Sequence, residues 1–183
     1  MVTAGRARTI GWALLLLSCV PGPMAAASEV PAPFRIRPGA IGVGLSGSLI
    51  AVEGSTHGAI AVRSGVFLGA GPGTLGLELE PAYVHIEGLD IFDLQVLAVW
   101  QLGIASTSAH AFAGLGGGVR QEWLGSFRQA RYPVGLQFGM NALVSRGAGV
   151  RMEYRYRRVL DDPVADYDEH QVFLGISLFL RNQ

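Results

Sequence analysis

The sequence has little charge, one cysteine and no lysine. Charged residues make up 15% of the chain, against roughly 25% in an ordinary soluble domain. The 14 basic residues, all of them arginine, balance 14 acidic ones. The chain therefore lacks the net positive charge that marks many nucleic-acid-binding proteins. A single cysteine excludes an intrachain disulfide framework and any zinc site built from several thiolates.

Long apolar runs are also missing beyond the first 20 residues, which makes a helical membrane protein a poor fit. Glycine is abundant at 26 of 183 residues, about twice average usage. Half of the chain is hydrophobic, yet it carries too few charges for a typical soluble enzyme. The length fits one domain after removal of a leader.

The amino terminus has the three parts of a secretory signal peptide. Arg6 and Arg8 form a positive region, Ile10 to Val20 form an apolar stretch, and Ala25-Ala26-Ala27 supplies small residues before Ser28. Two prolines directly after the apolar stretch end it well short of the roughly 20 residues that a transmembrane helix needs. We predict that residues 1–27 are a cleaved signal peptide and that the protein is exported.

Cys19 offers an alternative cleavage site. Leu16-Leu17-Ser18-Cys19 resembles a bacterial lipoprotein box, in which the cysteine would accept lipid. Leu17 is bulkier than that pattern usually carries, and the alanine-rich site follows it, so cleavage after Ala27 is favoured. The mature chain would then hold no cysteine, which suits an oxidising envelope compartment.

From residue 39 onward the hydrophobic pattern has a period of two, which indicates strands. Leu77 and Leu79 alternate with Glu78 and Glu80, and the same pattern recurs near the carboxyl terminus. A helix would scatter these residues around its circumference. Eight such segments are predicted: Ala40–Val52, Gly58–Leu68, Thr74–Ile86, Phe92–Ile104, Ala109–Leu124, Tyr132–Ser145, Gly149–Leu160 and Glu169–Leu180.

The polar face of these strands decides between a soluble and a membrane barrel. A water-facing surface normally carries many Lys and Glu, whereas this face is largely Gly, Ala, Ser and Gln, as at Ser46, Ser48, Gly135 and Gln137. Small residues suit the inside of a narrow eight-stranded barrel. The predicted fold is therefore all-β: an eight-stranded antiparallel up-and-down transmembrane β-barrel over residues 39–183, preceded by an extended lead-in over residues 28–38.

Closure and aromatic placement support this prediction. Backbone amides in hydrocarbon need internal partners, so spanning strands must close into a barrel, and an even number places both termini in the periplasm. Five aromatic residues fall near predicted strand ends, where an interface girdle would lie: Tyr83, Trp100, Trp123, Tyr132 and Tyr156. Pro81 is a difficulty because it removes a ladder hydrogen bond, and we expect a bulge there.

The chain resembles the small eight-stranded outer-membrane barrels of Gram-negative bacteria, of the OmpA/OmpX type and the outer membrane protein beta-barrel domain family. The matching features are the signal peptide, Ala113-Gly114-Leu115-Gly116-Gly117-Gly118-Val119, the strand Glu153-Tyr154-Arg155-Tyr156-Arg157, and the last alternating segment up to Leu180. The resemblance implies location in the outer membrane, with membrane lipid and lipopolysaccharide as partners. It also implies that the barrel assembly machinery reads the last strand, through Gly175, Leu178 and Leu180. The usual terminal aromatic is replaced by Leu180 followed by Arg181-Asn182-Gln183.

The strand alternation also sends a set of charged residues into the lumen. This predicted polar network consists of Arg63, Glu78, Glu80, Arg120, Glu122, Arg151, Glu153, Arg155 and Arg157. Buried charges persist when they are paired, and the planar guanidinium binds carboxylates bidentately. An eight-stranded barrel leaves an interior just wide enough for side chains. A structural plug is therefore favoured, and a narrow or gated pore is the alternative.

Two further charged features lie near the predicted outer rim. Arg158 points outward beside the aromatic residues, where it would either reach lipopolysaccharide phosphates or be solvated. The segment Asp161 to Glu169 carries five acids but lacks the spacing of a calcium loop. We expect a solvated acidic loop, and we predict neither a metal site nor a cofactor.

An enzyme is the next alternative, because some eight-stranded outer-membrane barrels modify lipid A. Ser108 and His110 share a strand face, as a nucleophile and its base would. The lipid A deacylase family has the order His-x-Ser, which is reversed here. No nucleophile elbow, zinc-protease motif or phosphate loop occurs. We therefore predict a non-enzymatic barrel with a structural or surface-interaction role, and a soluble periplasmic ligand-binding barrel remains a third class.

Overall fold

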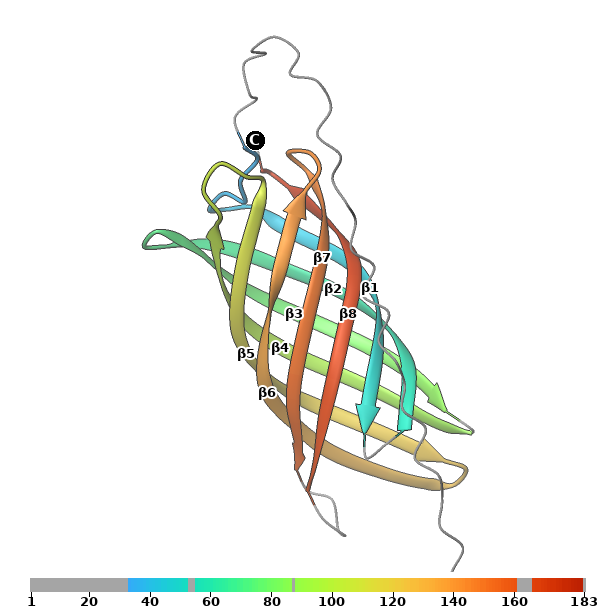
Figure 1. Cartoon of the computed structure of the whole chain (residues 1–183). Helices are drawn as coiled ribbons and strands as arrows, with labels where there is room; N and C mark the ends of the chain where they lie inside the picture. Colours follow the sequence, from blue (N-terminus) through green and yellow to red (C-terminus); the bar gives the residue numbers. More distant parts are fainter. Residues whose placement is uncertain (1–32, 53–54, 87, 161–165, 183) are drawn as a thin grey trace, which may run out of the picture. The chain divides into compact units, whose positions relative to one another are not determined.

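A computed structural model describes residues 33–52, 55–86, 88–160 and 166–182. Within these residues, eight long strands follow one another along the chain (Figure 1). They are β1 (Ile41–Val52), β2 (Ser55–Ala70), β3 (Gly73–Ile86), β4 (Leu89–Gly103), β5 (Ala109–Leu124), β6 (Phe127–Leu143), β7 (Ala148–Leu160) and β8 (Tyr167–Leu180). The predicted signal peptide, Cys19 and residues 161–165 lie outside the described residues.

Each strand pairs antiparallel with the next, and β8 pairs with β1, so the sheet closes into a barrel. This is the predicted fold. The predicted segments match the strands, but several strands are longer than expected. Strand β6 begins five residues before Tyr132, at Phe127, and β2 begins at Ser55, three residues before the predicted start at Gly58. In the described part of the chain no helix is long and apolar enough to cross a membrane.

The two ends of the barrel differ in their connections. Residues 33–40, the β2–β3, β4–β5 and β6–β7 turns, and Asn182 share one end, which we call the proximal end. The opposite, distal end holds the tight turn between β5 and β6. Gly71 and Gly125 occupy the short β2–β3 and β5–β6 turns at a φ of 59°, a backbone conformation that other residues rarely adopt.

Pro81 does not form the expected bulge. Strand β3 keeps one register with β4 from Thr74 to Ile86, and Pro81 pairs with Leu94. Its pairing with β2 lapses around Arg63 and then resumes in the same register. Pro133 of β6 behaves alike, because it pairs with β7 while the pairing with β5 lapses beside it. Each proline therefore removes a ladder hydrogen bond on one side without shifting the strand.

The apolar face of the sheet points outward and the polar face points inward. Leu77 is 44% exposed, whereas the adjacent Glu78 is 3% exposed. The same alternation holds for Met152 against Glu153 and for Ile176 against Ser177. A soluble barrel would show the opposite arrangement, because its core would be apolar. The predicted orientation of the two faces is therefore confirmed.

Glycine faces inward where neighbouring strands approach closely. A Cβ atom at Gly118 would lie 2.0 Å from the carbonyl oxygen of Leu94, on β4. The adjacent Gly117 points outward, where a Cβ would meet the side chain of Val134 at an ordinary 3.4 Å. Glycine is therefore required on the inner face of β5 because a Cβ atom would collide with the backbone of β4. This requirement is stricter than the need for small side chains in a narrow lumen.

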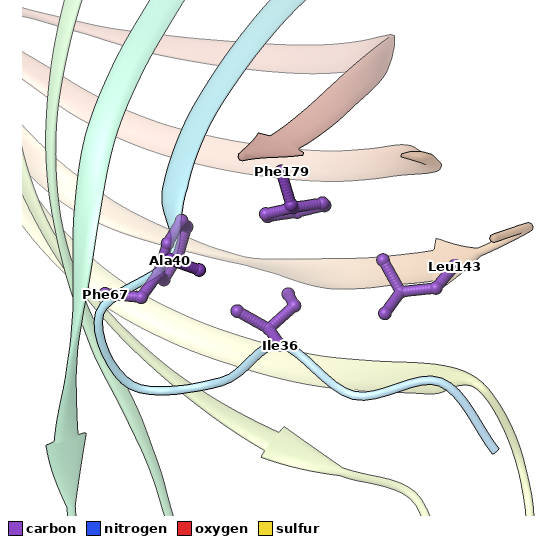
Figure 2. Close-up of a cluster of buried hydrophobic side chains, with 5 residues drawn as sticks. All are labelled: Ile36, Ala40, Phe67, Leu143 and Phe179. Carbon is purple, nitrogen blue, oxygen red and sulfur yellow. The ribbon is translucent and has the colours of Figure 1, made fainter. Parts of the chain in front are cut away.

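The lead-in closes the proximal end of the barrel. Residues 33–40, which we call the mouth segment, contain no helix or strand, and a turn at Pro38-Gly39 directs them into β1. Ile36 is 5% exposed and packs with Ala40, Phe67, Leu143 and Phe179 (Figure 2). The chain therefore enters the mouth before it begins the sheet, which the sequence pattern did not predict.

Candidate functional site

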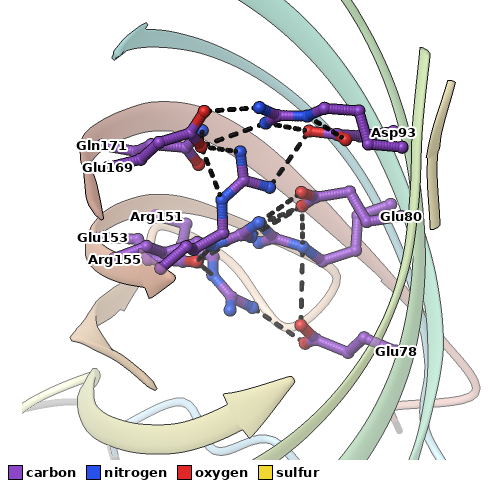
Figure 3. A network of polar contacts seen from close by, with 11 residues as sticks. Glu78, Glu80, Asp93, Arg151, Glu153, Arg155, Glu169 and Gln171 are labelled. Carbon is purple, nitrogen blue, oxygen red and sulfur yellow. Dashed lines mark hydrogen bonds and ion pairs between the residues drawn. The ribbon is translucent and has the colours of Figure 1, made fainter. Parts of the chain in front are cut away.

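The barrel interior holds the concentration of charge that the alternation predicts. All nine predicted lumen residues are buried. Because β2 and β3 lie across the barrel from β7, side chains distant in sequence meet at its axis. They separate into two clusters at different levels along the barrel (Figure 3).

The first group, which we call the inner cluster, joins three arginines to three glutamates: Arg63, Arg151, Arg155, Glu78, Glu80 and Glu153. Arg155 donates from Nη1 and Nη2 to the two oxygens of Glu80, at 2.6 and 2.8 Å. Its Nε donates to Glu153, which also accepts from Nε of Arg151 at 2.8 Å. The formal charges cancel within this group.

Arg63 and Arg151 connect Glu78, the third carboxylate, to the rest of the inner cluster. Arg63 donates from Nε to Glu80 at 2.8 Å and lies 3.4 Å from Glu78 and 3.2 Å from Glu153. Arg151 donates from Nη1 to Glu78 at 2.8 Å. Removing any one carboxylate would therefore leave at least two guanidinium groups short of a partner.

Two aromatic rings pack on the inner cluster. The guanidinium carbon of Arg151 lies 4.2 Å from the ring centre of Phe112, and that of Arg155 lies 4.2 Å from the ring centre of Phe173. Guanidinium planes stack on aromatic faces while their edges donate hydrogen bonds. The rings, from β5 and β8, therefore hold the planes of the two arginines.

The second group, which we call the distal cluster, joins Asp93, Arg120, Arg157 and Glu169. Arg120 donates to both oxygens of Asp93, at 2.8 and 2.9 Å, and to both oxygens of Glu169, at 2.5 and 3.0 Å. Arg157 bridges the same two carboxylates, at 3.1 and 2.6 Å. This group is also neutral, and Figure 3 shows it above the inner cluster.

Two members of the distal cluster were missed by sequence reasoning. Glu169, the last acid of the predicted solvated loop and the first residue of the last predicted strand, is the third residue of β8 and is buried, so the prediction of the strand is confirmed and that of solvation is wrong. Asp93 of β4, the second of the two, is also buried. Both share the odd-numbered parity of inward neighbours, Gln171 on β8 and Gln95 on β4, so the alternation already contained the signal.

The remaining predicted lumen acid, Glu122, lies beside the distal cluster. Its carboxylate is 3.1 Å from Nε of Arg131 and 4.0 Å from Nη1 of Arg120. The ring of Tyr167 lies 5.3 Å from the guanidinium carbon of Arg131 and also accepts a hydrogen bond from Arg120 through its hydroxyl, at 3.0 Å. The charged network thus continues toward the distal end.

Apolar and amide side chains fill the lumen on the proximal side of the clusters. Leu97, Val99 and Phe112 form a buried group, and Asn141 donates to Gln101 at 3.1 Å. Two small voids adjoin the inner cluster, one beside Arg155 and Gln137 and one beside Arg63 and Phe179. Each is about large enough for one water molecule. Apolar, amide and charged side chains of the described residues thus occupy successive levels of the lumen.

Ser108 and His110, the candidate catalytic pair, both contact the mouth segment. Ser108 accepts the backbone N–H of Phe34 through Oγ at 2.9 Å, and His110 accepts that of Ile36 through Nε2 at 3.3 Å. A base in catalysis would need that nitrogen for its nucleophile. In this arrangement both side chains position the backbone of residues 33–40.

The five predicted girdle residues all point outward. Tyr83, Tyr132 and Trp100 are exposed, and Trp123 and Tyr156 are half-buried. The hydroxyl of Tyr83 donates to Asp90 at 2.6 Å. Their role at a membrane interface stays a prediction.

The residues of the predicted assembly signal lie on both faces of β8. Leu178 and Leu180 are exposed on the outer face, and Gly175 faces inward against Ser46.

The outward Arg158 is exposed and lies 3.5 Å from Asp166. Among the described residues, no group of three or more His, Cys, Asp or Glu side chains is placed to hold a metal ion.

Solved outer-membrane proteins share this architecture. Neisserial surface protein A matches with a TM-score of 0.54 at 10% identity, covering 76% of this chain and 95% of that one. The amino-terminal β-barrel domain of Pseudomonas aeruginosa OprF matches with a TM-score of 0.54 at 14% identity, covering 76% and 97%. OprG from Pseudomonas aeruginosa matches with a TM-score of 0.51 at 12% identity, covering 80% and 98%.

At these identities the likeness establishes the fold. The predicted resemblance to small eight-stranded outer-membrane barrels is confirmed at that level. No protein-family model and no curated protein sequence matches the chain.

Proposed function

We propose that the chain is a non-enzymatic outer-membrane β-barrel of a Gram-negative cell envelope, with a structural or surface-interaction role. One observation carries the proposal: the sheet presents leucine, valine and isoleucine outward while arginine, glutamate and aspartate fill its axis. Hydrocarbon is the surrounding that stabilises such a surface, because lipid tails cover apolar side chains and the closed sheet satisfies its backbone. Membrane lipid and lipopolysaccharide are the implied partners, and the barrel assembly machinery acts during biogenesis.

The charged interior supports a structural role in preference to transport. Both clusters are neutral, and hydrogen bonds in each join strands that are not neighbours in the sheet. An ion crossing this lumen would have to displace arginine–carboxylate pairs that hold each other in a low-dielectric interior. The clusters thus brace opposite walls and block the axis.

Membrane insertion is tested with detergent-extracted protein. We expect partition into the detergent phase, and faster gel migration before boiling than after it, because closed barrels resist unfolding by detergent. Recovery in the aqueous phase would overturn the proposal and favour a soluble periplasmic ligand-binding barrel.

A narrow pore is the second candidate, favoured by the charged lining and the two voids beside the inner cluster. Planar-bilayer recordings separate the two. If the network gates a pore, Glu78→Ala raises single-channel conductance, because Arg63 and Arg151 lose a partner. We expect no conductance change relative to wild type or to the exposed control Asp166→Asn.

The lipid A-modifying alternative is tested by extraction of lipid A from cells that express wild type or His110→Ala. We expect identical lipid profiles, because His110 holds the backbone of Ile36. A modified lipid A that depends on His110 would show that the barrel is an enzyme.

A further inference from the structure

The mouth segment is held by side chains that accept its backbone amides. Ser108 accepts from Phe34 at 2.9 Å and His110 from Ile36 at 3.3 Å. Asn182, beyond the end of β8, accepts from Arg37 at 2.8 Å through Oδ1. Ser108 and His110 lie around the start of β5, whereas Asn182 follows β8. The three acceptors therefore come together around the mouth segment only after the barrel closes.

Of these three acceptors, His110 alone changes its hydrogen-bonding character with protonation in the range near neutrality and below. A neutral imidazole has one acceptor nitrogen, and the N–H of Ile36 uses it at Nε2, which places the ring proton on Nδ1. A protonated imidazole carries N–H on both nitrogens and accepts nothing. The amide oxygen of Asn182 and the hydroxyl of Ser108 undergo no such change.

The surroundings of His110 do not compensate a positive charge. His110 is buried, with 3% of the residue exposed. Its register partners are Gly103 on β4 and Asn141 on β6. The mouth segment contributes Arg35, whose guanidinium donates to Thr107 and Ile104 carbonyl oxygens at 2.6 and 3.2 Å.

The hollow beside His110 adds no carboxylate among the described residues. The polar hollow at the proximal end is lined by Arg35, Pro38, Thr74, Gln101 and His110, among other residues, with no acid among the described ones. Toward the axis the next inward side chain of β5 is Phe112, and the guanidinium on its face, Arg151, is already neutralised by Glu78 and Glu153. An imidazolium at position 110 would be a buried charge close to the Arg35 guanidinium, with no carboxylate among the described residues that line the hollow.

We propose that the mouth segment is a pH-dependent plug of the proximal end, seated while His110 is neutral and released when His110 takes up a proton. Protonation removes the acceptor for Ile36 and places a second cation beside Arg35 in the hollow at the proximal end. Release exposes Phe67, Leu143 and Phe179 to water and widens the polar hollow. The inner cluster stays closed, so release uncovers a binding surface at the mouth and does not open a pore.

The plug is tested by thiol accessibility, since the chain has no cysteine after Cys19. The mature barrel carrying Ile36→Cys is reacted in detergent micelles with dithiodipyridine, which labels thiols at acid pH. The rate is divided by that of Ala105→Cys, an exposed position at the same end. We expect this ratio to rise on the order of tenfold between about pH 7.5 and about pH 3.5, across the range where imidazole gains its proton.

Matched variants at His110 distinguish release caused by protonation of His110 from a general loss of structure at acid pH. His110→Gln keeps an amide oxygen as acceptor and does not titrate, so the ratio should stay low at both pH values. His110→Phe removes the acceptor, so the ratio should be high at both. A flat ratio in wild type, or the same rise in His110→Gln, would overturn the proposal. Folding is verified by gel migration, and Phe34→Cys is the second reporter if Ile36→Cys does not fold.

Discussion

Every arginine of the two clusters lies between at least two carboxylates, and the guanidinium makes this possible. Arg155 contacts Glu80 with two nitrogens and Glu153 with the third. A lysine ammonium offers three donors at one point on a flexible stem and cannot reach two carboxylates with a fixed plane. The absence of lysine from the chain agrees with an interior in which each cation must bridge strands.

The cost of breaking this bridging can be measured at Glu153. Glu153→Gln leaves Arg63, Arg151 and Arg155 with one negative charge too few, and it should lower the free energy of unfolding by about 3–5 kcal/mol. Asp166→Asn, at the exposed pair with Arg158, should change it by about 0–1 kcal/mol. Urea titration of folding into lipid vesicles measures both, and equal effects would contradict a buried network.

At the scale of strands, the alternation of the sequence determines which residues face the axis. The approach of the neighbouring strand determines how large a side chain each inward position can hold. The inner faces of β5 and β6 are rich in glycine because a side chain would strike the neighbouring backbone, as a Cβ at Gly135 would strike the carbonyl oxygen of Tyr156 at 2.1 Å. Small residues in the sequence indicated a narrow lumen. The collision between a Cβ atom and the neighbouring backbone depends on how the strands pair, which the pattern of small residues does not specify.

Gly118 and Gly117 make a matched pair for this argument. Gly118→Ala forces β4 and β5 apart and should destabilise the barrel by about 1–3 kcal/mol, the usual cost of overpacking. Gly117→Ala adds its methyl group on the outer face at ordinary contact distance and should have little effect. Equal urea midpoints for the two variants in vesicles would show that the inner face has room to spare.

At the scale of the molecule, the barrel is inverted relative to a soluble protein, with its charges inside and its apolar side chains outside. The proximal end is closed by apolar packing around Ile36, and the centre is closed by ion pairs. Two neutral clusters and one apolar plug thus fill the axis at successive levels.

This inversion predicts a depth dependence for charge on the outer face. Leu136→Arg, in the middle of β6, should cost about 2–4 kcal/mol of folding free energy in vesicles, whereas Leu124→Arg, at the distal end of β5, should cost about 0–1 kcal/mol. Vesicle folding titrations again provide the measurement. If water covers the outer face, both substitutions will be nearly neutral.

A period of two in the amino-acid sequence was enough to predict the strands, their number and the face on which each residue lies, because these follow from local backbone geometry. It therefore placed Glu80 and Arg155 inside. Their contact with each other, the pairing of Asp93 and Glu169 with Arg120, and the seat of Ile36 in the mouth depend on barrel closure and strand stagger. Those distances join residues far apart in the chain, and only the closed tertiary structure determines them.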